Sequence, residues 1–354
     1  MKIERFGFIL GLLFGSVIGL SLAAASVDQL ESALKKDPDN ITVRERLARQ
    51  FSNMKQWDKV IEHLNPHTDV ASPRGYLLLA TAYQEVKNFK SVARVLRLLS
   101  EKRPKDYHIQ FMLGDALIKQ AGTVTELTER QKLEASGIES FRAAIRIKRT
   151  FRPPYQALVN YFVSAGMNLE AREQINDMLK VFGNRPELHA DLCRLYALDG
   201  FLQQAVRYCN RARQLNADLP ESYIYLAQAY FDQKEMERAE QTLIEAAKRF
   251  PRSEFVQYGT GQFFLQKSNF PVAMKYLKRA VASQSGSARS QLALAKSLFE
   301  SGLEEESLAH FSKACQIETA AQSDVLAAAS RLRLKGSSSL AARFSQAAGA
   351  CKRP

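Results

Sequence analysis

The feature that most constrains this chain is a spacing of 34 residues that recurs through its C-terminal part. One series of mostly apolar residues with this spacing comprises Leu158, Leu192, Leu226, Thr260, Leu294 and Ala328. A second series, made of small residues, comprises Ala171, Ala205, Ala239, Ala273, Ser307 and Ala341. A period of this length indicates one supersecondary unit that is repeated and stacked on its neighbours.

Each repeat has the pattern of two amphipathic helices. In residues 220–251, PESYIYLAQAYFDQKEMERAEQTLIEAAKRFP, two apolar stripes follow helical spacing. The first stripe comprises Tyr223, Leu226, Ala227 and Tyr230, and the second comprises Ala239, Leu243 and Ala246. Proline opens the first helix and follows the second, as its fixed φ and missing N–H favour. The unit is therefore predicted to be a helical hairpin.

This pattern resembles the tetratricopeptide repeat, a helix-turn-helix unit of 34 residues. The resemblance covers roughly residues 27–350 and implies an all-α, right-handed solenoid of about nine repeats behind an N-terminal signal segment. The family's glycine in the first helix is mostly alanine here, and one unit has Val159. Trp57, the single tryptophan, falls in a second helix and not at the family's usual large position.

Running the register along the chain predicts its division into segments. The expected order is a signal peptide or signal anchor, a lone N-terminal helix, two repeats, a repeat with an insertion near 119–133, five regular units and a capping repeat. Their expected bounds are 1–25, 27–40, 41–106, 107–151, 152–321 and 322–354.

The N-terminus has the order of an export signal. Two cations, Lys2 and Arg5, precede an apolar run that ends in Ala23, Ala24 and Ala25. We expect cleavage after Ala25 and a periplasmic location. The alternative is an inner-membrane anchor over residues 6–25, whose four glycines recur every fourth residue. Either way the cations stay inside, so the repeats are expected outside the cytoplasm.

The resemblance implies that the first helix of each repeat lines a concave groove. Two residues after each member of the first apolar series comes a polar residue: Asn160, Arg194, Gln228, Gln262 and Lys296. Amide and guanidinium groups suit the backbone of an extended peptide. Apolar groove positions are expected beside this ladder at Ile224, Phe231, Phe255, Tyr258 and Phe299. The alternative is ordinary polar surface with aromatic residues that pack locally.

Four cysteines are present, and none of them forms a CxxC motif. Cys193 and Cys209 fall on the facing stripes of one repeat, so they either form a disulfide or are two small buried side chains. His63 and His67 have the i, i+4 spacing of a metal pair, but no third ligand stands out. No GxSxG, HExxH, phosphate-loop or dinucleotide motif occurs. We therefore expect no enzyme, no metal and no cofactor.

The charge balance is basic, with 50 Lys and Arg against 37 Asp and Glu. Residues 141–154, FRAAIRIKRTFRPP, and later second helices concentrate these cations on a face expected to be convex. Export argues against nucleic acid as the partner.

Our main hypothesis is a non-catalytic scaffold in the cell envelope that binds peptide segments of partner proteins, which the sequence does not name. One alternative is an assembly factor of a secretion, pilus or motility machine whose basic face contacts membrane or peptidoglycan. The other alternative is a regulatory subunit that positions a separate enzyme.

Overall fold

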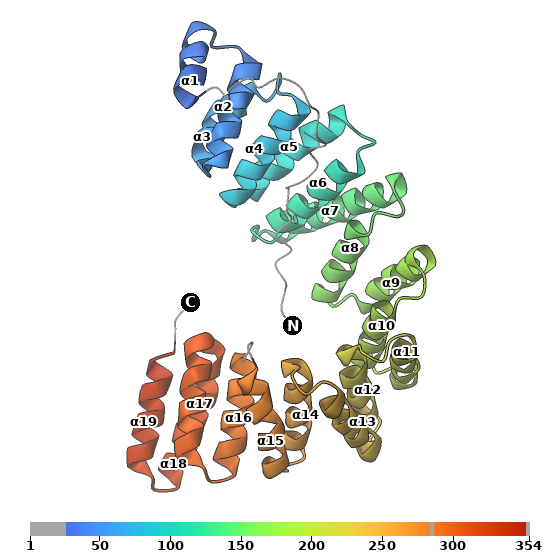
Figure 1. Cartoon of the computed structure of the whole chain (residues 1–354), viewed down its shortest axis with the longest axis vertical. Coiled ribbons are helices and arrows are strands. Elements are labelled where there is room, and N and C mark those ends of the chain that lie inside the picture. Colours follow the sequence, from blue (N-terminus) through green and yellow to red (C-terminus); the bar gives the residue numbers. More distant parts are fainter. Residues whose placement is uncertain (1–25, 284–286, 352–354) are drawn as a thin grey trace. The chain divides into compact units, whose positions relative to one another are not determined.

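The computed structural model describes residues 26–283 and 287–351, and over these every regular element is a helix (Figure 1). The predicted all-α class is confirmed. The described residues form nineteen α-helices, which agrees with about nine two-helix repeats and one additional helix. The predicted signal or anchor over residues 1–25, with its cleavage position Ala25, lies outside the described residues.

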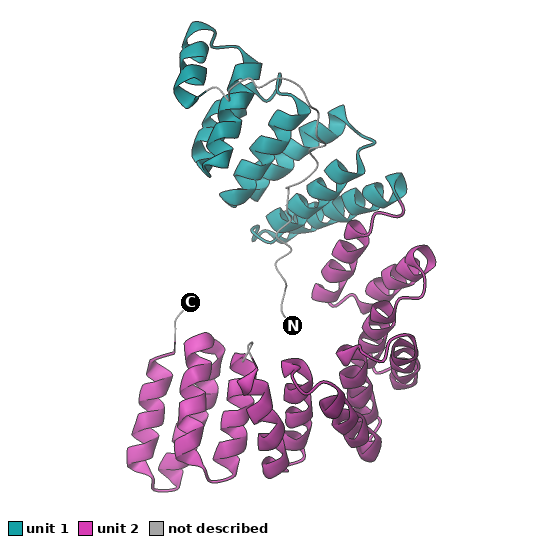
Figure 2. Cartoon of the chain, in the orientation of Figure 1, with its two compact units in different colours: residues 1–148 teal, residues 149–354 magenta. Residues whose placement is uncertain are grey.

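Two compact units make up the chain, residues 1–148 and residues 149–354 (Figure 2). In the first unit, a single helix precedes three helical pairs. The helices are α1 (Val27–Lys36), α2 (Ile41–Asn53), α3 (Trp57–Leu64), α4 (Pro73–Glu85), α5 (Phe89–Lys102), α6 (Tyr107–Ala121) and α7 (Leu127–Ile147), with a 3₁₀ turn, η1 (Asn65–His67).

The second unit consists of six helical pairs. These are α8 (Pro153–Ser164) with α9 (Asn168–Phe182), α10 (Pro186–Leu198) with α11 (Leu202–Leu215), α12 (Pro220–Asp232) with α13 (Met236–Arg249), α14 (Glu254–Gln266) with α15 (Phe270–Ala282), α16 (Ala288–Glu300) with α17 (Glu304–Ile317), and α18 (Gln322–Leu334) with α19 (Ser338–Gly349). A 3₁₀ turn, η2 (Thr319–Ala321), precedes α18.

The turns inside the pairs follow the 34-residue spacing in their backbone conformation. In the second unit one turn residue per pair has a φ between 56° and 81°, namely Gly166, Gly200, Lys234, Ser268, Gly302 and Gly336. Glycine adopts this left-handed conformation without steric cost, whereas a residue with a Cβ does not. Four of the six turns therefore have glycine at this position. The other two hold Lys234 and Ser268 in a backbone conformation that residues with a Cβ disfavour.

The core lies between the two helices of each pair and between neighbouring pairs. The series Ala171, Ala205, Ala239 and Ala273 is completely buried, which places the predicted small residues where the second helices approach the first. In two pairs a glycine of the first helix also allows the two helices to approach closely. A Cβ on Gly114 would lie 2.7 Å from the Phe141 ring, and one on Gly261 would lie 2.5 Å from Leu277 Cγ. Large side chains of the second helix fill the space that these glycines leave.

The predicted insertion near 119–133 is mostly helical. It extends the second helix of its pair, so that α7 has 21 residues, whereas the second helices of the second unit have 12 to 15. The short loop between α6 and α7, residues 122–126, takes up the remainder. The first part of α7 therefore reaches beyond the regular length of the repeat.

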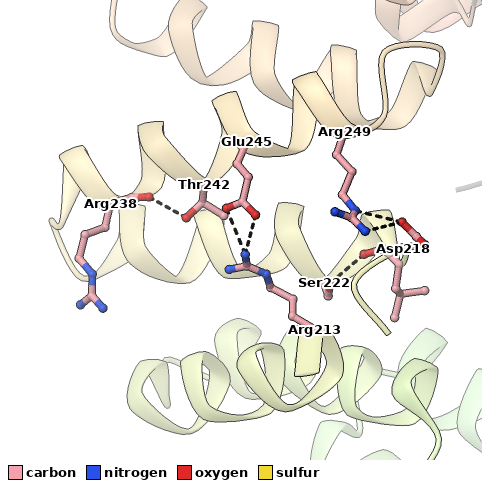
Figure 3. Close-up of polar contacts among 8 residues, drawn as sticks. Arg213, Asp218, Ser222, Arg238, Thr242, Glu245 and Arg249 are labelled. Carbon is pink, nitrogen blue, oxygen red and sulfur yellow. Dashed lines mark hydrogen bonds and ion pairs between the residues drawn. The ribbon is translucent and has the colours of Figure 1, made fainter. Parts of the chain in front are cut away.

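Ion pairs connect α13 to the preceding helical pair and to the loop before α12 (Figure 3). Arg213 Nη2 of α11 donates to both carboxylate oxygens of Glu245 on α13, at 2.9 and 3.1 Å. Arg249 at the end of α13 contacts Asp218, in the loop before α12, at 2.8 Å. These side chains are partly exposed, so each ion pair adds only about 0.2–1 kcal/mol to stability.

A membrane-spanning helix would need a long apolar stretch. None of the helices within residues 26–283 and 287–351 has the length and hydropathy to cross a bilayer.

Candidate functional site

The first helices of the second unit come together on one face. From α10 to α16 each first helix contacts the next, α10 with α12, α12 with α14 and α14 with α16, whereas α11, α13 and α15 pack mainly against first helices. A stack whose members are closest along one side curves toward that side. The first helices therefore form the inner face of this stretch.

A glycine of α14 lies at the contact between α12 and α14. A Cβ on Gly259 would lie 3.0 Å from Cδ1 of Ile224, so Ile224 lies against the backbone of α14. This contact explains why Ile224 is half-buried and closes the space between the two helices. The predicted groove residue Ile224 thus packs between helices as well as bordering the surface.

Members of the predicted polar ladder lie on first helices, and three of them have partners. Asn160 on α8 accepts a hydrogen bond from Gln156 at 3.2 Å, and Gln228 on α12 donates to Asp232 at 2.9 Å. Lys296 on α16 forms an ion pair with Asp324 on α18 at 2.7 Å. A ligand that engages these three side chains has to displace an existing contact.

The other two members of the ladder, Arg194 on α10 and Gln262 on α14, are half-buried. Neither makes a hydrogen bond or ion pair with another residue that the structure describes. Half-buried polar groups without partners lose part of their hydration and gain nothing in exchange. They are the members of the ladder that a bound segment engages at the least cost.

The predicted apolar residues divide into two groups. Phe231 and Phe255 are half-buried and contact neighbouring rings edge to face, Phe231 with Phe263 at 5.9 Å and Phe255 with Tyr225 at 6.4 Å. Tyr258 is half-buried below the guanidinium of Arg289, which lies 5.5 Å from its ring centroid. These three side chains keep part of their surface open on first helices.

Phe299 differs from this group because it is buried. It is 3% exposed and its ring lies 6.0 Å from that of Phe344. Arg331 covers the ring at 4.9 Å. The expectation that Phe299 lines an open groove is therefore not met, because its side chain fills the core between the last two pairs.

A carboxylate that the sequence reasoning overlooked lies on the same inner face. Asp191 of α10 precedes Arg194 by one helical turn and is half-buried. Burial raises its pKa to about 6, while the nearby Arg194 opposes the shift and Glu221 adds to it. It forms no hydrogen bond or ion pair with any described residue. The helical spacing to Arg194 was the signal that would have identified it.

Tyr225 of α12 borders this carboxylate. Burial raises the pKa of the Tyr225 hydroxyl, and the charges of Arg194, Asp191 and Glu221 act on it as well. The neighbouring aromatic ring is that of Phe255 on α14. The inner face of α10, α12 and α14 therefore combines unpartnered polar groups with half-exposed aromatic rings.

Both cysteine pairs are bonded in the structure. Cys193 and Cys209 join α10 to α11 with an S–S distance of 2.05 Å, which is the pairing that the sequence left as one of two alternatives. Cys315 at the end of α17 is bonded to Cys351 after α19. The first disulfide holds α10, the helix that carries Asp191 and Arg194.

The predicted basic face is partly neutralised. In the first unit Arg146 pairs with Glu139 at 2.6 Å. In the second unit Arg207, Lys275, Lys278 and Arg279 are exposed on second helices, opposite the inner face in each pair. Within residues 26–283 and 287–351, no three His, Cys, Asp or Glu side chains are grouped to hold a metal ion.

Comparison with protein families identifies the repeats. Two family models, both described as tetratricopeptide repeat, match residues 197–257 and 258–325. No curated protein matches the sequence significantly.

Solved structures share the fold at low sequence identity. Yeast Tom70 matches with a TM-score of 0.55 and 14% identity over 93% of this chain and 81% of that one. The C-terminal part of a repeat protein from Cytophaga hutchinsonii matches with a TM-score of 0.51 and 15% identity over 71% and 99%. A tetratricopeptide repeat protein from Parabacteroides merdae matches with a TM-score of 0.50 and 14% identity over 74% and 93%. At such identities the likeness concerns the fold alone.

Proposed function

We propose that this chain, which is a tetratricopeptide repeat protein, is a non-catalytic scaffold that binds an extended segment of a partner protein on the inner face of α10, α12, α14 and α16. The observation that carries the proposal is the set of half-buried polar side chains without partners on that face, Asp191, Arg194 and Gln262. Such groups destabilise the free protein and gain hydrogen bonds when a peptide backbone covers them.

The aromatic side chains complete this surface. Tyr225, Phe255 and Tyr258 offer large rigid contact area at low entropic cost, which is typical of residues that dominate binding energy. A segment that lies along the inner face would place one or two large side chains against these rings. Its backbone would meet Gln262 and Arg194, which bond to groups present in any sequence.

The proposal is tested by co-purification of partners from the native cell with a matched pair of variants. Asp191→Asn combined with Tyr225→Ala changes the inner face, whereas Lys278→Ala changes an exposed residue of α15. We expect a specific partner that is lost with the first variant, by tenfold or more, and retained with the second. Equal recovery with both variants would contradict binding on the inner face.

We further propose that the chain acts in the cell envelope, as a periplasmic protein released from a signal at residues 1–25. Support comes from the residue order of that segment and from the two disulfides, because structural disulfides persist in oxidising compartments. Mass spectrometry of the native protein tests this. A mature chain that starts at Ser26 is expected, and a chain that retains residues 6–25 would favour the anchored form.

A second candidate role rests on the exposed cations of second helices, Arg207, Lys275, Lys278 and Arg279. An assembly factor that uses this face would bind anionic membranes. Sedimentation with vesicles containing phosphatidylglycerol tests this role by comparing the chain with the Lys275→Gln, Lys278→Gln, Arg279→Gln variant. Equal sedimentation of the two proteins would exclude it.

A further inference from the structure

A cavity of about 320 Å³ lies in the first unit between α5, α6 and the added part of α7. Its wall includes three cationic side chains of α5, Lys90, Arg94 and Arg97, together with Gln120 of α6 and Leu133 of α7. The cavity is remote in sequence from the inner face discussed above, because all of its residues precede residue 149.

The three cations lie on one face of α5. They follow the spacing i, i+4 and i+7, which places them on successive turns of the same side. None of them forms an ion pair with a residue that the structure describes, and no described Asp or Glu lines the cavity. Arg94 Nη2 donates to Asn65 Oδ1 at 2.6 Å, which orients its guanidinium and leaves its other N–H groups available. The cavity is therefore bordered by three exposed cations that have no carboxylate partner among the described residues.

Gln120 is a second and independent sign of a ligand. Its residue is 8% exposed, its side chain lines the cavity, and its amide makes no hydrogen bond to any other described residue. The side chain is thus held in place by burial, while its amide donor and acceptor are free to bond to a ligand in the space beside it. The Gln120 side chain can donate to an anion while the cations neutralise its charge.

The lengthened helix α7 supplies the outer wall. Leu133 lies in the first part of α7 and packs against the core of the first unit. A second helix of the length found in the second unit, ending at the same place, would begin close to or after this residue and would not supply this wall. The three cations are exposed, so they border the mouth of the cavity. The added part of α7 thus supplies one wall of a hollow beside this face of α5.

We propose that this cavity binds a small molecule with two or more phosphate or carboxylate groups. Lys90 and Arg97 are seven residues apart, about 10 Å along the helix axis, which is more than a single phosphate can span. The arginine side chains match both phosphate and carboxylate oxygens in bidentate geometry. The volume lies at the lower end of the range for small-molecule sites. A small molecule with two anionic groups, each near a different turn of α5, fits both the spacing of the cations and the volume of the cavity.

The test uses the purified full-length chain and isothermal titration calorimetry with two probes, pyrophosphate and citrate, at constant ionic strength. Three variants are compared: Arg97→Gln, which removes one cavity cation; Gln120→Leu, which keeps the net charge and the volume; and Arg142→Gln, which removes an exposed cation of α7 outside the cavity. Thermal unfolding of each variant verifies that it is folded.

We expect at least one probe to bind, and the tighter of the two to tell phosphate from carboxylate. Affinity should fall tenfold or more for Arg97→Gln and at least threefold for Gln120→Leu, and should stay within twofold for Arg142→Gln. Equal losses for Arg97→Gln and Arg142→Gln, with none for Gln120→Leu, would show unspecific attraction to a basic protein and overturn the proposal. Failure of both probes to bind at millimolar concentration would also overturn it.

Discussion

Arg172 of α9 and Asp199, in the turn after α10, form an ion pair in which the arginine is only 7% exposed. The Arg172 guanidinium also lies 4.7 Å from the ring centroid of Tyr196, and Asn168 donates a second hydrogen bond to Asp199. These contacts join two consecutive helical pairs through a buried charge. Removal of the carboxylate would leave that charge without a counterion.

We predict that Asp199→Ala lowers the free energy of unfolding by about 1–2 kcal/mol, less than for a fully buried pair because the carboxylate is partly exposed. Urea unfolding followed by circular dichroism measures the change. The control is Asp177→Ala, which removes an exposed carboxylate paired with Lys180 and should cost less than about 0.5 kcal/mol. Equal effects of the two substitutions would show that burial of Arg172 adds nothing.

The same ion pair predicts a dependence on acid pH. The hydrogen bond from Asn168 and then the Arg172 charge hold the pKa of Asp199 below its usual 3.8. A carboxylate whose pKa is lowered in the folded state stabilises that state at pH values above its unfolded-state pKa. This contribution is lost as the pH falls through the pKa of the folded state. The stability difference between the native chain and Asp199→Ala should therefore be constant above pH 5 and shrink below about pH 4. A difference that persists at pH 2 would contradict this account.

Asp191 predicts the opposite behaviour, because burial raises its pKa from 3.8 to about 6. A carboxyl whose pKa is higher in the folded state binds more protons when folded, so stability falls as the pH rises from about 4 to about 6. The groups that face it are Arg194 and Glu187 of α10, Glu221 and Tyr225 of α12, and Arg152 before α8.

Asp191→Asn, which cannot ionise, should therefore stabilise the chain by up to about 3 kcal/mol at pH 7.5 and by little at pH 4. Thermal unfolding at the two pH values measures this difference. A stabilising substitution that reduces partner binding is typical of a functional site. Destabilisation by Asp191→Asn at pH 7.5 would mean that the carboxylate has a structural partner and would weaken its assignment to the groove.

The left-handed turn series gives a test at exposed residues, Lys234 and Ser268. Lys234→Gly and Ser268→Gly should each stabilise the chain by about 1 kcal/mol, because glycine relieves a φ of 68° or 56°. Gly200→Ala should destabilise by a similar amount, since its φ is 77° and an added Cβ meets no atom within 4 Å. Urea midpoints of the three variants measure these effects, and a loss of stability in both glycine variants would contradict the backbone explanation.

The disulfide between Cys193 and Cys209 closes 16 residues of sequence. By loop-closure entropy, the Cys193→Ala, Cys209→Ala variant should lose about 3 kcal/mol of unfolding free energy. Alkylation of the native protein without reductant should label none of the four cysteines. Labelling of all four would show that the pairs are reduced in the cell and would argue against an oxidising compartment.

The sequence predicts the fold well because the 34-residue spacing repeats the same contacts many times. A polar residue in one unit, such as Thr260 in the first apolar series, does not obscure the pattern. Thr260 is buried, and its hydroxyl donates a hydrogen bond to Val256 O at 2.8 Å. Gly114 and Gly261 occupy the position that is mostly alanine in the other units, and the large side chains opposite them explain why glycine is retained there.

The candidate site is less predictable for a physical reason. The register places a residue on a face but does not say whether a neighbour covers it or satisfies its hydrogen bonds. Phe299 lies on the expected face and is nevertheless buried against Phe344, and Lys296 is engaged by Asp324. Asp191 shares the helix and face of Arg194, but its significance depends on the absence of a partner among the described residues, which requires coordinates.

The most direct test of the central claim is photo-crosslinking in living cells with a reactive amino acid at Gln262 on the inner face, and with Lys278 as the control position. Gln262 is half-buried on α14 without a described partner, whereas Lys278 is exposed on α15 of the same pair. The account predicts one discrete product from Gln262 that disappears in the Asp191→Asn, Tyr225→Ala background, and none from Lys278. Products from Lys278 alone, or from both positions equally, would contradict a groove that binds its partner on the first helices.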